Sequence, residues 1–218
     1  MCGRYATTAN PARLVAELDA VDETAVDETA VDETGDDETG DDKAGAPADP
    51  AKSAEANYNV APTTQVLTVV ARRDTAESAP SLRIRRMRWG LVPFWTKAAE
   101  PGVPVKGKPL FNARADRAAT APSFRDSVRK RRCLVPMDGW YEWLVEPEPD
   151  ARGKAVKQPY YMSDAEGGRL YMAGLWSVWR DNSQAEPKPL MSCTILTTDA
   201  VGGLIRIHDR MPLVMPRE

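Results

Sequence analysis

Apolar positions along this chain follow the spacing of strands more often than that of helices. In SLRIRRMRW, residues 81–89, basic and apolar residues alternate as they do in a half-buried strand. Four further segments combine β-branched or aromatic residues with short apolar runs, and Gly, Pro and Asp turns separate them. The segments in which we expect these further strands are residues 65–71, 132–144, 160–179 and 190–200.

Convincing helical patterns are few. PARLVAELDA, residues 11–20, begins with a proline, which favours the first helical turn, and spaces its apolar residues for one face. Two shorter helical segments are expected at residues 123–131 and 201–208. The balance predicts a β-rich α+β fold, with mostly antiparallel pairing in a curved sheet or partly closed barrel and a few flanking helices.

Residues 21–50 interrupt this pattern with an acidic repeat of five residues, which begins VDETA, VDETA, VDETG. A period of five advances about 140° per copy around a helix, so Val21, Val26 and Val31 share no face. We therefore expect a solvated low-complexity loop, inserted into a single domain that spans residues 1–218. An alternative is that the repeat screens a basic surface of the protein as a mimic of nucleic acid.

The repeat also hides the charge of the rest of the chain. The protein has a net charge of −3, but residues 21–50 hold twelve acids and one base, so the remaining 188 residues carry +8. A basic body is a modest indication of a polyanionic partner. No apolar run is long enough to cross a bilayer, and the first residues lack the pattern of a signal peptide, so we expect no membrane contact and a cytoplasmic location.

Three cysteines, at positions 2, 133 and 193, form neither a disulfide framework nor a metal-binding spacing, so we expect no metal and no cofactor. Cys133 and Cys193 lie in apolar strand-like segments and are expected in the core. Cys2 differs, because removal of Met1 would leave a 1,2-aminothiol. An α-amine titrates near about pH 8 and condenses with an aldehyde to an imine, which the thiol can then close to a five-membered thiazolidine.

Two further side chains are candidates for acid–base chemistry. His208 is the only histidine, and with Asp209 and Arg210 it forms a polar insert between apolar residues, where an imidazole suits proton transfer. A structural role for His208 is the alternative. Glu142 lies between two aromatic residues in DGWYEWL, where desolvation would raise its pKa and suit it to acid–base work, unless strand alternation turns it outward.

Other residues are suited to binding. Asn112 and Arg114 in FNARAD would point the same way if this segment is extended, and an amide beside a guanidinium can bind a phosphate or a sugar hydroxyl. Arginines and tryptophans also occur together, as in proteins that bind single-stranded nucleic acid, where charges follow the phosphates and rings stack on bases. The residues that supply these groups are Arg4, Arg85, Arg86, Arg88, Arg114, Trp89 and Trp95.

Seven short segments resemble, in the same order, those of the SOS-response-associated peptidase (SRAP) family, the abasic-site processing proteins. They cover nearly the whole chain outside the acidic repeat, and the shared order makes chance agreement very improbable. The segments are MCGRY, NYNVAPT, RWGLVPFW, FNARAD, DGWYEW, YMAGLW and HDRMPLV.

The resemblance implies an abasic-site sensor that is covalently linked to single-stranded DNA and protects the lesion during the DNA damage response. It implies that Cys2, exposed by removal of Met1, forms the thiazolidine with the opened sugar. Asn112 would orient that sugar, Glu142 would stabilise the bound site and assist imine chemistry, and His208 would move protons. The family's peptidase label refers mainly to its own N-terminal processing.

The resemblance also implies a DNA-binding surface and a cellular setting. The partner would be single-stranded DNA carrying abasic sites, bound by a monomer that joins the nucleoid when DNA is damaged. Phe94 and Trp95 stand where some family members have two tryptophans. The family continues past its last motif, so we expect a C-terminal segment to be missing here. The residues expected to contact DNA are Arg4, Asn59, Pro62, Trp95, Arg114, Thr197 and Arg210.

Two other functions remain open on the sequence. N-terminal-nucleophile amidohydrolases also begin Met-Cys-Gly and would release ammonia from glutamine, but this activity explains neither FNARAD nor HDRMPLV. A non-catalytic module for single-stranded DNA would keep its affinity, with a steep salt dependence, after Cys2→Ala and would never form a covalent adduct.

Overall fold

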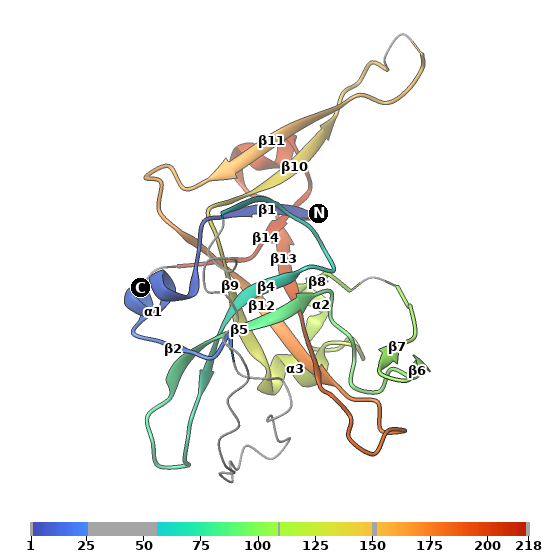
Figure 1. Ribbon diagram of the computed structural model, residues 1–218. Helices are drawn as coiled ribbons and strands as arrows, with labels where there is room; N and C mark the ends of the chain where they lie inside the picture. The colour runs from blue at the N-terminus through green and yellow to red at the C-terminus, as the bar shows by residue number, and fades with distance from the viewer. Residues whose placement is uncertain (1, 26–55, 109, 150–151, 217–218) are drawn as a thin grey trace.

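The structure, a computed structural model, describes residues 2–25, 56–108, 110–149 and 152–216. Over these residues the chain forms two curved sheets that share a core, with short helices at their margins (Figure 1). Most strand pairs are antiparallel, which confirms the predicted β-rich α+β class.

The larger sheet curls far enough for distant strands to meet. Its strands, in order across the sheet, are β14 (Arg210–Pro212), β13 (Leu190–Asp199), β12 (Leu170–Trp179), β9 (Arg132–Met137), β4 (Gln65–Arg72), β5 (Ser81–Trp89) and β2 (Val21–Asp22). β13 also pairs in parallel with β5, where Cys193 lies opposite Trp89. This second pairing makes the sheet partly ring-like. Two short strands join it at the side: β8 (Asn112–Arg114) next to β13, and β15 (Val214–Met215) next to β12.

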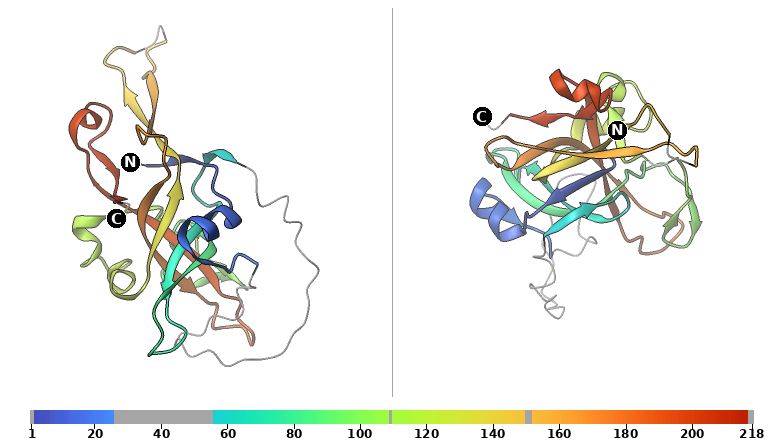
Figure 2. Two further views of the ribbon diagram at one scale, coloured as in Figure 1. Left: turned by 90° about the vertical axis from the view of Figure 1, so that its left-hand side faces the viewer. Right: turned by 90° about the horizontal axis from the view of Figure 1, so that it is seen from above.

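The smaller sheet carries the N-terminal strand. Its strands, in order across the sheet, are β11 (Lys157–Ser163), β10 (Gly139–Val145), β1 (Arg4–Thr7) and β3 (Asn57–Val60). β10 and β11 extend beyond β1 as a hairpin that projects from the body of the molecule (Figures 1 and 2). A separate short hairpin consists of β6 (Ala98–Glu100) and β7 (Val103–Pro104).

The helices confirm one sequence prediction closely and another in part. α1 (Pro11–Leu18) begins where expected, because the Asn10 side chain accepts a hydrogen bond from the Arg13 backbone N–H at 2.8 Å. It ends at Asp19, which takes the left-handed conformation (φ 49°). α3 (Arg125–Lys130) lies inside the second predicted helix, whereas the third segment forms a 3₁₀ helix, η2 (Gly202–Arg206). A short helix that was not predicted, α2 (Ala115–Ala118), follows β8.

One cluster of buried side chains joins the two sheets. It includes Tyr5 and Trp140 from the smaller sheet and both Cys133 and Cys193 from the larger one. The two cysteines are therefore core residues, as predicted, and burial raises the pKa of Cys193 to about 12. Gly174 is required beside Cys133, because a Cβ at this position would lie 2.9 Å from the Cys133 sulfur.

The first residues of the predicted acidic loop, 21–23, are attached to the larger sheet and do not form a loop. Val21 and Asp22 pair in parallel with β5, and the buried carboxylate of Glu23 accepts hydrogen bonds from Arg83 and Arg85. The repeat was predicted to be solvated because its spacing builds no apolar face. This first copy is nevertheless attached to the larger sheet, by its pairing with β5 and by the ion pairs of Glu23. Residues 26–50 of the predicted loop lie outside the described residues.

Within the described part of the chain, no helix is long and apolar enough to span a membrane.

Candidate active site

Cys2 is held at the junction of the two sheets. Its side chain is buried in the core cluster that contains Tyr5 and Trp140. Its backbone carbonyl accepts a hydrogen bond of 2.7 Å from Nδ2 of Asn112. Burial, and secondarily the charge of Glu142, raise the pKa of the Cys2 thiol to about 12. Because Met1 precedes Cys2 in the chain, the Cys2 nitrogen is an amide, and the buried thiol is protonated at neutral pH.

Asn112 reaches Cys2 from the larger sheet. β8 is extended and runs parallel to β13, with Asn112 opposite Ile195 and Arg114 opposite Thr197. The segment that holds Asn112 and Arg114 is thus extended, which is the condition under which both side chains were expected to point the same way. Oδ1 of Asn112 is buried and has no hydrogen-bond partner among the described residues. The side-chain nitrogen of Asn112 therefore positions Cys2, while its side-chain oxygen is available to accept a hydrogen bond from a hydroxyl of a bound molecule.

Glu142 faces inward, so the prediction of a desolvated carboxyl is confirmed and the outward alternative is wrong. Only 3% of its surface is exposed, whereas its neighbour Trp143 on the other face of β10 is exposed. Burial raises the pKa of Glu142 above its ordinary value. A carboxyl with a raised pKa can hold a proton nearer neutral pH and donate it to a leaving hydroxyl.

His208 shares a small cavity with Glu142. The cavity is also lined by Trp140 and Met162 from the smaller sheet and by Leu204 from η2. Trp140 Nε1 is buried without a hydrogen-bond partner among the described residues. The structure therefore brings the two predicted acid–base residues together, although they are far apart in the sequence.

The environment of His208 suits proton transfer. Its Nδ1 lies 2.9 Å from the backbone nitrogen of Arg210 and 2.8 Å from a carboxylate oxygen of Asp209. A neutral ring with its proton on Nε2 accepts the Arg210 N–H, and a protonated ring pairs with Asp209. Both protonation states of the imidazole thus have a partner on the same nitrogen.

The residues expected to contact DNA fall into three groups: polar residues on the surface, a buried pair, and two residues that line a cavity. Arg4 lies on the surface next to Asn59 and donates to its Oδ1 at 2.8 Å. The exposed Arg114 makes two hydrogen bonds with Asp116, at 2.9 and 3.1 Å, which raise the pKa of the guanidinium. The second group consists of Thr197 and Arg210, which are both buried.

The buried pair is bonded internally. Arg210 Nη2 donates to the Thr197 backbone carbonyl at 2.6 Å, and Nη1 pairs with Asp199. Arg210 and Thr197 thereby hold β14 against β13, and the backbone N–H of Arg210 contacts His208. The contact of these two residues with DNA stays a prediction.

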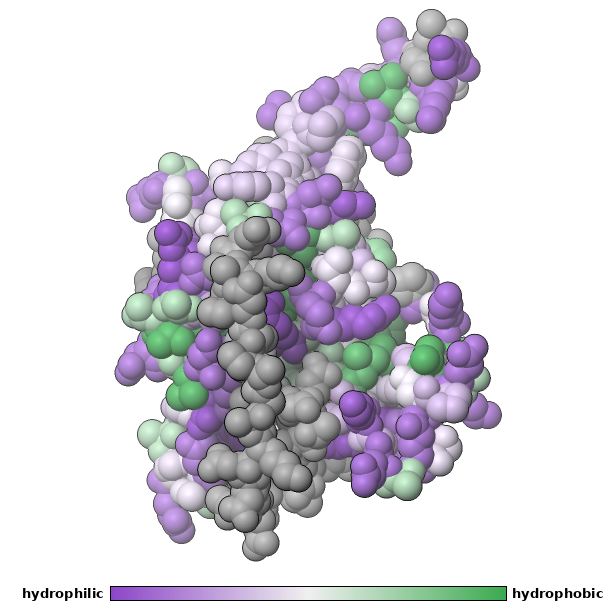
Figure 3. All heavy atoms as spheres, viewed as in Figure 1, coloured by the Kyte–Doolittle hydropathy of each residue, from purple (hydrophilic) through white to green (hydrophobic). Residues whose placement is uncertain are grey.

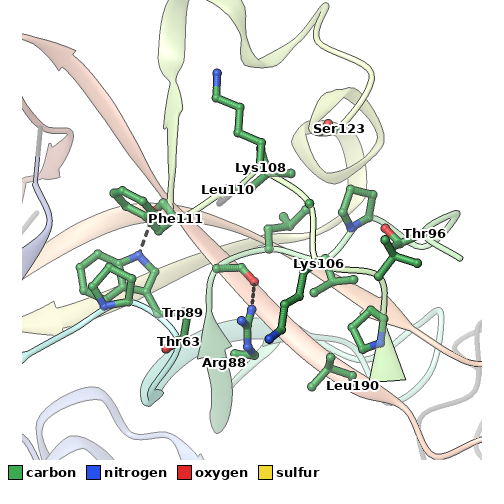
Figure 4. Close-up of a pocket in the computed structure, with 18 of the residues that line it drawn as sticks. Thr63, Arg88, Trp89, Thr96, Lys106, Lys108, Leu110, Phe111, Ser123 and Leu190 are labelled. Atoms are coloured by element: carbon green, nitrogen blue, oxygen red, sulfur yellow. Dashed lines mark hydrogen bonds between the residues drawn. The ribbon is translucent and has the colours of Figure 1, made fainter. Parts of the chain in front are cut away.

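Pro62 and Trp95 line a large cavity of about 1120 Å³, whose wall also includes Arg88, Trp89 and Phe111 (Figure 4). Trp95 is 55% exposed at its rim. The wall of this cavity is connected to the candidate active site through Phe111, the residue before Asn112. Trp89 Nε1, also in the wall, donates a hydrogen bond to the carbonyl of Phe111 at 2.8 Å.

The sequence predictions missed several residues of this cavity. It is lined by Val103 and Leu110 among other apolar residues, and by three lysines, Lys97, Lys106 and Lys108. Their signal in the sequence was the cluster of lysines in TKAAEPGVPVKGKPLF, between the motifs RWGLVPFW and FNARAD. An apolar wall with cationic groups suits a ligand that has both rings and negative charge.

Among the described residues, no group of three or more His, Cys, Asp or Glu side chains is arranged to hold a metal ion. The site combines the carboxyl of Glu142, the imidazole of His208, the amide of Asn112 and the thiol of Cys2. Together these groups are suited to proton transfer and to reactions of a carbonyl group.

Known proteins resemble this chain over most of its length. "Abasic site processing protein YoqW" of Bacillus subtilis is 32% identical over 163 residues, which are 74% of this chain and 63% of that protein. "Abasic site processing protein YedK" of Escherichia coli is 33% identical over 162 residues, 74% of this chain and 61% of that protein. "Abasic site processing protein HMCES" of Gallus gallus is 33% identical over 183 residues, 73% of this chain and 50% of that protein. The chain thus spans less than two thirds of the length of these relatives.

Solved structures share the fold. A crystal structure of a protein from Bacteroides thetaiotaomicron superposes with a TM-score of 0.66 at 22% identity and covers 99% of this chain and 78% of its own. A protein from Bordetella bronchiseptica gives a TM-score of 0.59 at 23% identity, with 99% and 84% covered. The sequence profile of the family described as "SOS response associated peptidase (SRAP)" matches residues 1–218. The chain therefore belongs to the SRAP family.

Proposed function

We propose that this protein senses abasic sites in single-stranded DNA and becomes covalently linked to them through Cys2 as a thiazolidine. The observation that carries the proposal is the convergence of four residues: Asn112 binds the Cys2 carbonyl at 2.7 Å, and Cys2 packs in the same core cluster as Trp140, which lines the cavity shared by Glu142 and His208. The names of the relatives, abasic site processing proteins, support the substrate.

The first step is loss of Met1. Hydrolysis of the Met1–Cys2 amide adds one water molecule, releases methionine and leaves an α-amine on Cys2. The family description, a peptidase, supports an activity of this kind, which we confine to the protein's own N-terminus. The free amine titrates near about pH 8, so a useful fraction is unprotonated and nucleophilic at neutral pH.

The second step captures the sugar. An abasic deoxyribose equilibrates between a closed hemiacetal and an open aldehyde, so groups that move protons at the ring oxygen favour opening. The Cys2 amine then attacks the aldehyde carbon and water leaves, which produces an imine. We assign proton donation to the leaving hydroxyl to Glu142, whose pKa is raised by burial, and proton transfer at the sugar to His208. The unpartnered Oδ1 of Asn112 would accept a sugar hydroxyl.

The third step closes the ring. The Cys2 sulfur adds to the imine carbon, the thiol proton passes to the nitrogen, and a five-membered thiazolidine results. A buried thiol with a pKa near 12 is a poor nucleophile for free aldehydes. Here the imine is tethered to the same residue, so ring closure is intramolecular and strongly favoured over capture from solution.

The cellular part of the proposal follows from the same chemistry. A cross-link at an abasic site would protect the lesion in exposed single strands during the DNA damage response. We propose that the protein acts as a monomer in the cytoplasm and associates with the nucleoid when DNA is damaged. The basic charge of the chain outside residues 21–50 supports a polyanionic partner.

A denaturing gel tests the proposal. The mature protein is mixed with single-stranded DNA that carries one abasic site, and a shifted band is expected. Cys2→Ala should give no band, and neither should intact DNA, whereas Cys133→Ala, which alters a buried core cysteine, should still react. Mass spectrometry should show that Met1 is absent from the protein that reacts.

Other results would contradict the proposal. No adduct after long incubation of the processed protein would favour the non-catalytic binding module, and release of ammonia from glutamine would favour the amidohydrolase. Glu142→Gln and His208→Ala should slow formation or reversal of the adduct. Wild-type rates in both variants would show that the acid–base assignments are wrong.

A further inference from the structure

Trp140 is an exception among the buried tryptophans of this protein. Trp89, which is fully buried, donates its indole N–H to the carbonyl of Phe111 at 2.8 Å. Trp179, which is 1% exposed, donates to the carbonyl of Thr96 at 2.6 Å. Trp140 is only 5% exposed, yet its Nε1 has no hydrogen-bond partner among the described residues. Because an unpaired buried donor is costly, this N–H is a candidate for binding a small molecule.

The cavity beside Trp140 has the size of one water molecule. Its volume is about 10 Å³. A buried site needs about 10–15 Å³ to hold one water. A sugar, a base or a phosphate group is too large for this space. Size alone therefore restricts the ligand of this cavity to water.

The polar groups that line the cavity suit a water molecule. Glu142 follows Trp140 by two residues on the same face of β10, and its carboxyl lines the cavity together with the indole. His208, between η2 and β14, supplies an imidazole from the other side. A buried water makes about three hydrogen bonds and needs at least two polar partners. The indole is a donor, and an ionised carboxylate and a neutral imidazole nitrogen are acceptors.

Arg210 adds a second donor to this lining. Its two Nη atoms are bonded, one to Asp199 and the other to the carbonyl of Thr197. Its Nε, in contrast, is buried without a hydrogen-bond partner among the described residues, and Arg210 lines the same cavity. Two donors and two acceptors are the complete set of hydrogen bonds that one water molecule can make.

We propose that this cavity binds one water molecule that joins Glu142 to His208, and that Trp140 is a positioning residue whose indole N–H holds this water. The water oxygen accepts from the indole, and its two O–H bonds donate to the carboxylate and the imidazole. Such a bridge fixes the relative orientation of two groups that come from distant parts of the chain, and it couples their protonation. The effect on cross-linking rests on the proposed function, whereas the water site is a property of the protein without DNA.

The first measurement detects the water directly. The tryptophan indoles are isotope-labelled in the processed protein without DNA, and transfer of magnetisation from water to each indole proton is recorded by NMR. We expect contact with a long-lived water at Trp140 and none at Trp89 or Trp179, whose N–H groups are bonded to carbonyls. The Trp140 signal is identified by its loss in Trp140→Phe. If that variant fails to fold, contacts with Met162, which lies opposite Trp140, identify it instead.

The second measurement tests the positioning role. Trp140→Phe keeps an aromatic ring and removes the N–H. Trp143→Phe is the matched control, because Trp143 is exposed on the other face of β10, in a hairpin covered mainly by hydrophilic residues and residues of intermediate hydropathy (Figure 3). Trp140→Phe should slow single-turnover cross-linking about tenfold, a part of the about 10²–10⁴-fold that acid–base catalysis contributes. Trp143→Phe should react at the wild-type rate.

A double-mutant cycle separates positioning from packing. In a His208→Ala background the bridge has lost one end, so Trp140→Phe should slow the reaction little further. A loss of rate as large in that background as in the wild type would show that Trp140 only supports packing, and the positioning role would be wrong. Absence of a water contact at Trp140 in the folded protein would overturn the inference, and so would equal rates for Trp140→Phe and Trp143→Phe.

Failure of this inference can be told apart from failure of the proposed function. If the wild-type protein forms no adduct, the proposed function fails, and the water contact at Trp140 still decides whether the site exists. If the adduct forms but Trp140 shows no water contact, only the inference fails.

Discussion

Two buried clusters of polar side chains differ in how completely they are paired. Glu23, at the start of the acidic repeat, has one carboxylate oxygen bonded to Arg83 and the other to Arg85. At the candidate active site, Asn112 Oδ1 and Trp140 Nε1 are buried without a partner among the described residues. Leaving a buried polar group unpaired costs about 1–3 kcal/mol. The first cluster therefore stabilises the fold, whereas the second keeps binding capacity at a cost in stability.

The largest effect on stability is expected from Glu23→Ala. The substitution leaves two arginines, of which Arg83 is 14% and Arg85 is 9% exposed, without their shared carboxylate. Removing one partner from a buried ionic cluster costs about 3–5 kcal/mol, and this should be seen as a lower urea midpoint at pH 7. The control is Asp74→Ala, since the exposed Asp74 also pairs with Arg83.

The control should cost less than about 1 kcal/mol, because exposed ion pairs contribute little. Both variants should cross-link DNA at the wild-type rate while folded. Equal stability losses for Glu23→Ala and Asp74→Ala would show that the buried cluster around Glu23 stabilises the fold no more than an exposed ion pair does.

Asn112→Ala should have the opposite effect, with a large loss of cross-linking rate and little loss of stability. It removes the 2.7 Å bond that positions the Cys2 carbonyl, so the single-turnover rate of cross-linking should fall about a hundredfold. Stability should change by only about 1 kcal/mol, because the same substitution removes an unpaired buried oxygen. Thr194→Val serves as the control, since Thr194 Oγ1 is also buried and unpartnered but lies outside the site. A loss of stability without loss of rate would contradict the positioning role.

Glu142→Gln sharpens the comparison through pH. Burial raises the pKa of Glu142 above its ordinary value of 4.5, so the folded protein holds this proton to higher pH than the unfolded chain. Wild-type stability contributed by this group is therefore full below about pH 4.5 and falls as pH rises through the raised pKa. Glu142→Gln lacks this titration, so its melting temperature relative to wild type should increase over that window.

The same variant should cross-link more slowly, because an amide cannot donate the carboxylic proton. Glu166→Gln, on an exposed turn, is the matched control for both measurements. A constant difference in melting temperature across the pH series would show that Glu142 titrates normally.

The smallest effect is expected at Asp181, which is far from the chemistry. Its carboxylate accepts hydrogen bonds from the Gly102 backbone N–H, the Ser183 hydroxyl and the Gln184 amide, which lower its pKa. Stability from this group is present above the ordinary pKa of about 3.8 and is lost as pH falls through the lower folded value. Asp181→Asn should therefore be less sensitive to acid than wild type in melting experiments below pH 4. If the melting temperatures of Asp181→Asn and wild type fall equally with pH, Asp181 does not contribute to the loss of stability in acid.

The elements of the fold could be predicted because each has a local cause. Alternation in 81–89 predicts a half-buried strand, and β5 occupies these residues; Asn10 and Pro11 predict the start of α1. The same local rules were wrong at Val21 and Glu23, because spacing within a repeat does not report a partner strand or two arginines that follow 60 and 62 residues later in the chain.

The site was predictable in part. Cys2 and His208 stood out by residue type and position, and the inward direction of Glu142 was one of two open alternatives. The burial of Thr197 and Arg210 was not foreseen, since the resemblance placed both among the residues expected to contact DNA. The lysines that line the large cavity were also missed, because their cluster in the sequence does not show that the segment forms the wall of a cavity.

The sequence by itself determined the strand-rich class, the capped helix and an N-terminal cysteine that can become an aminothiol, because these depend on neighbouring residues and on side-chain chemistry. Only the tertiary structure decided that Asn112 holds Cys2, that Glu142 and His208 share one cavity, and that Arg4 lies beside Asn59. The reason is physical: alternation specifies which face of a strand is buried, but the pairing of distant strands depends on the packing of the whole core.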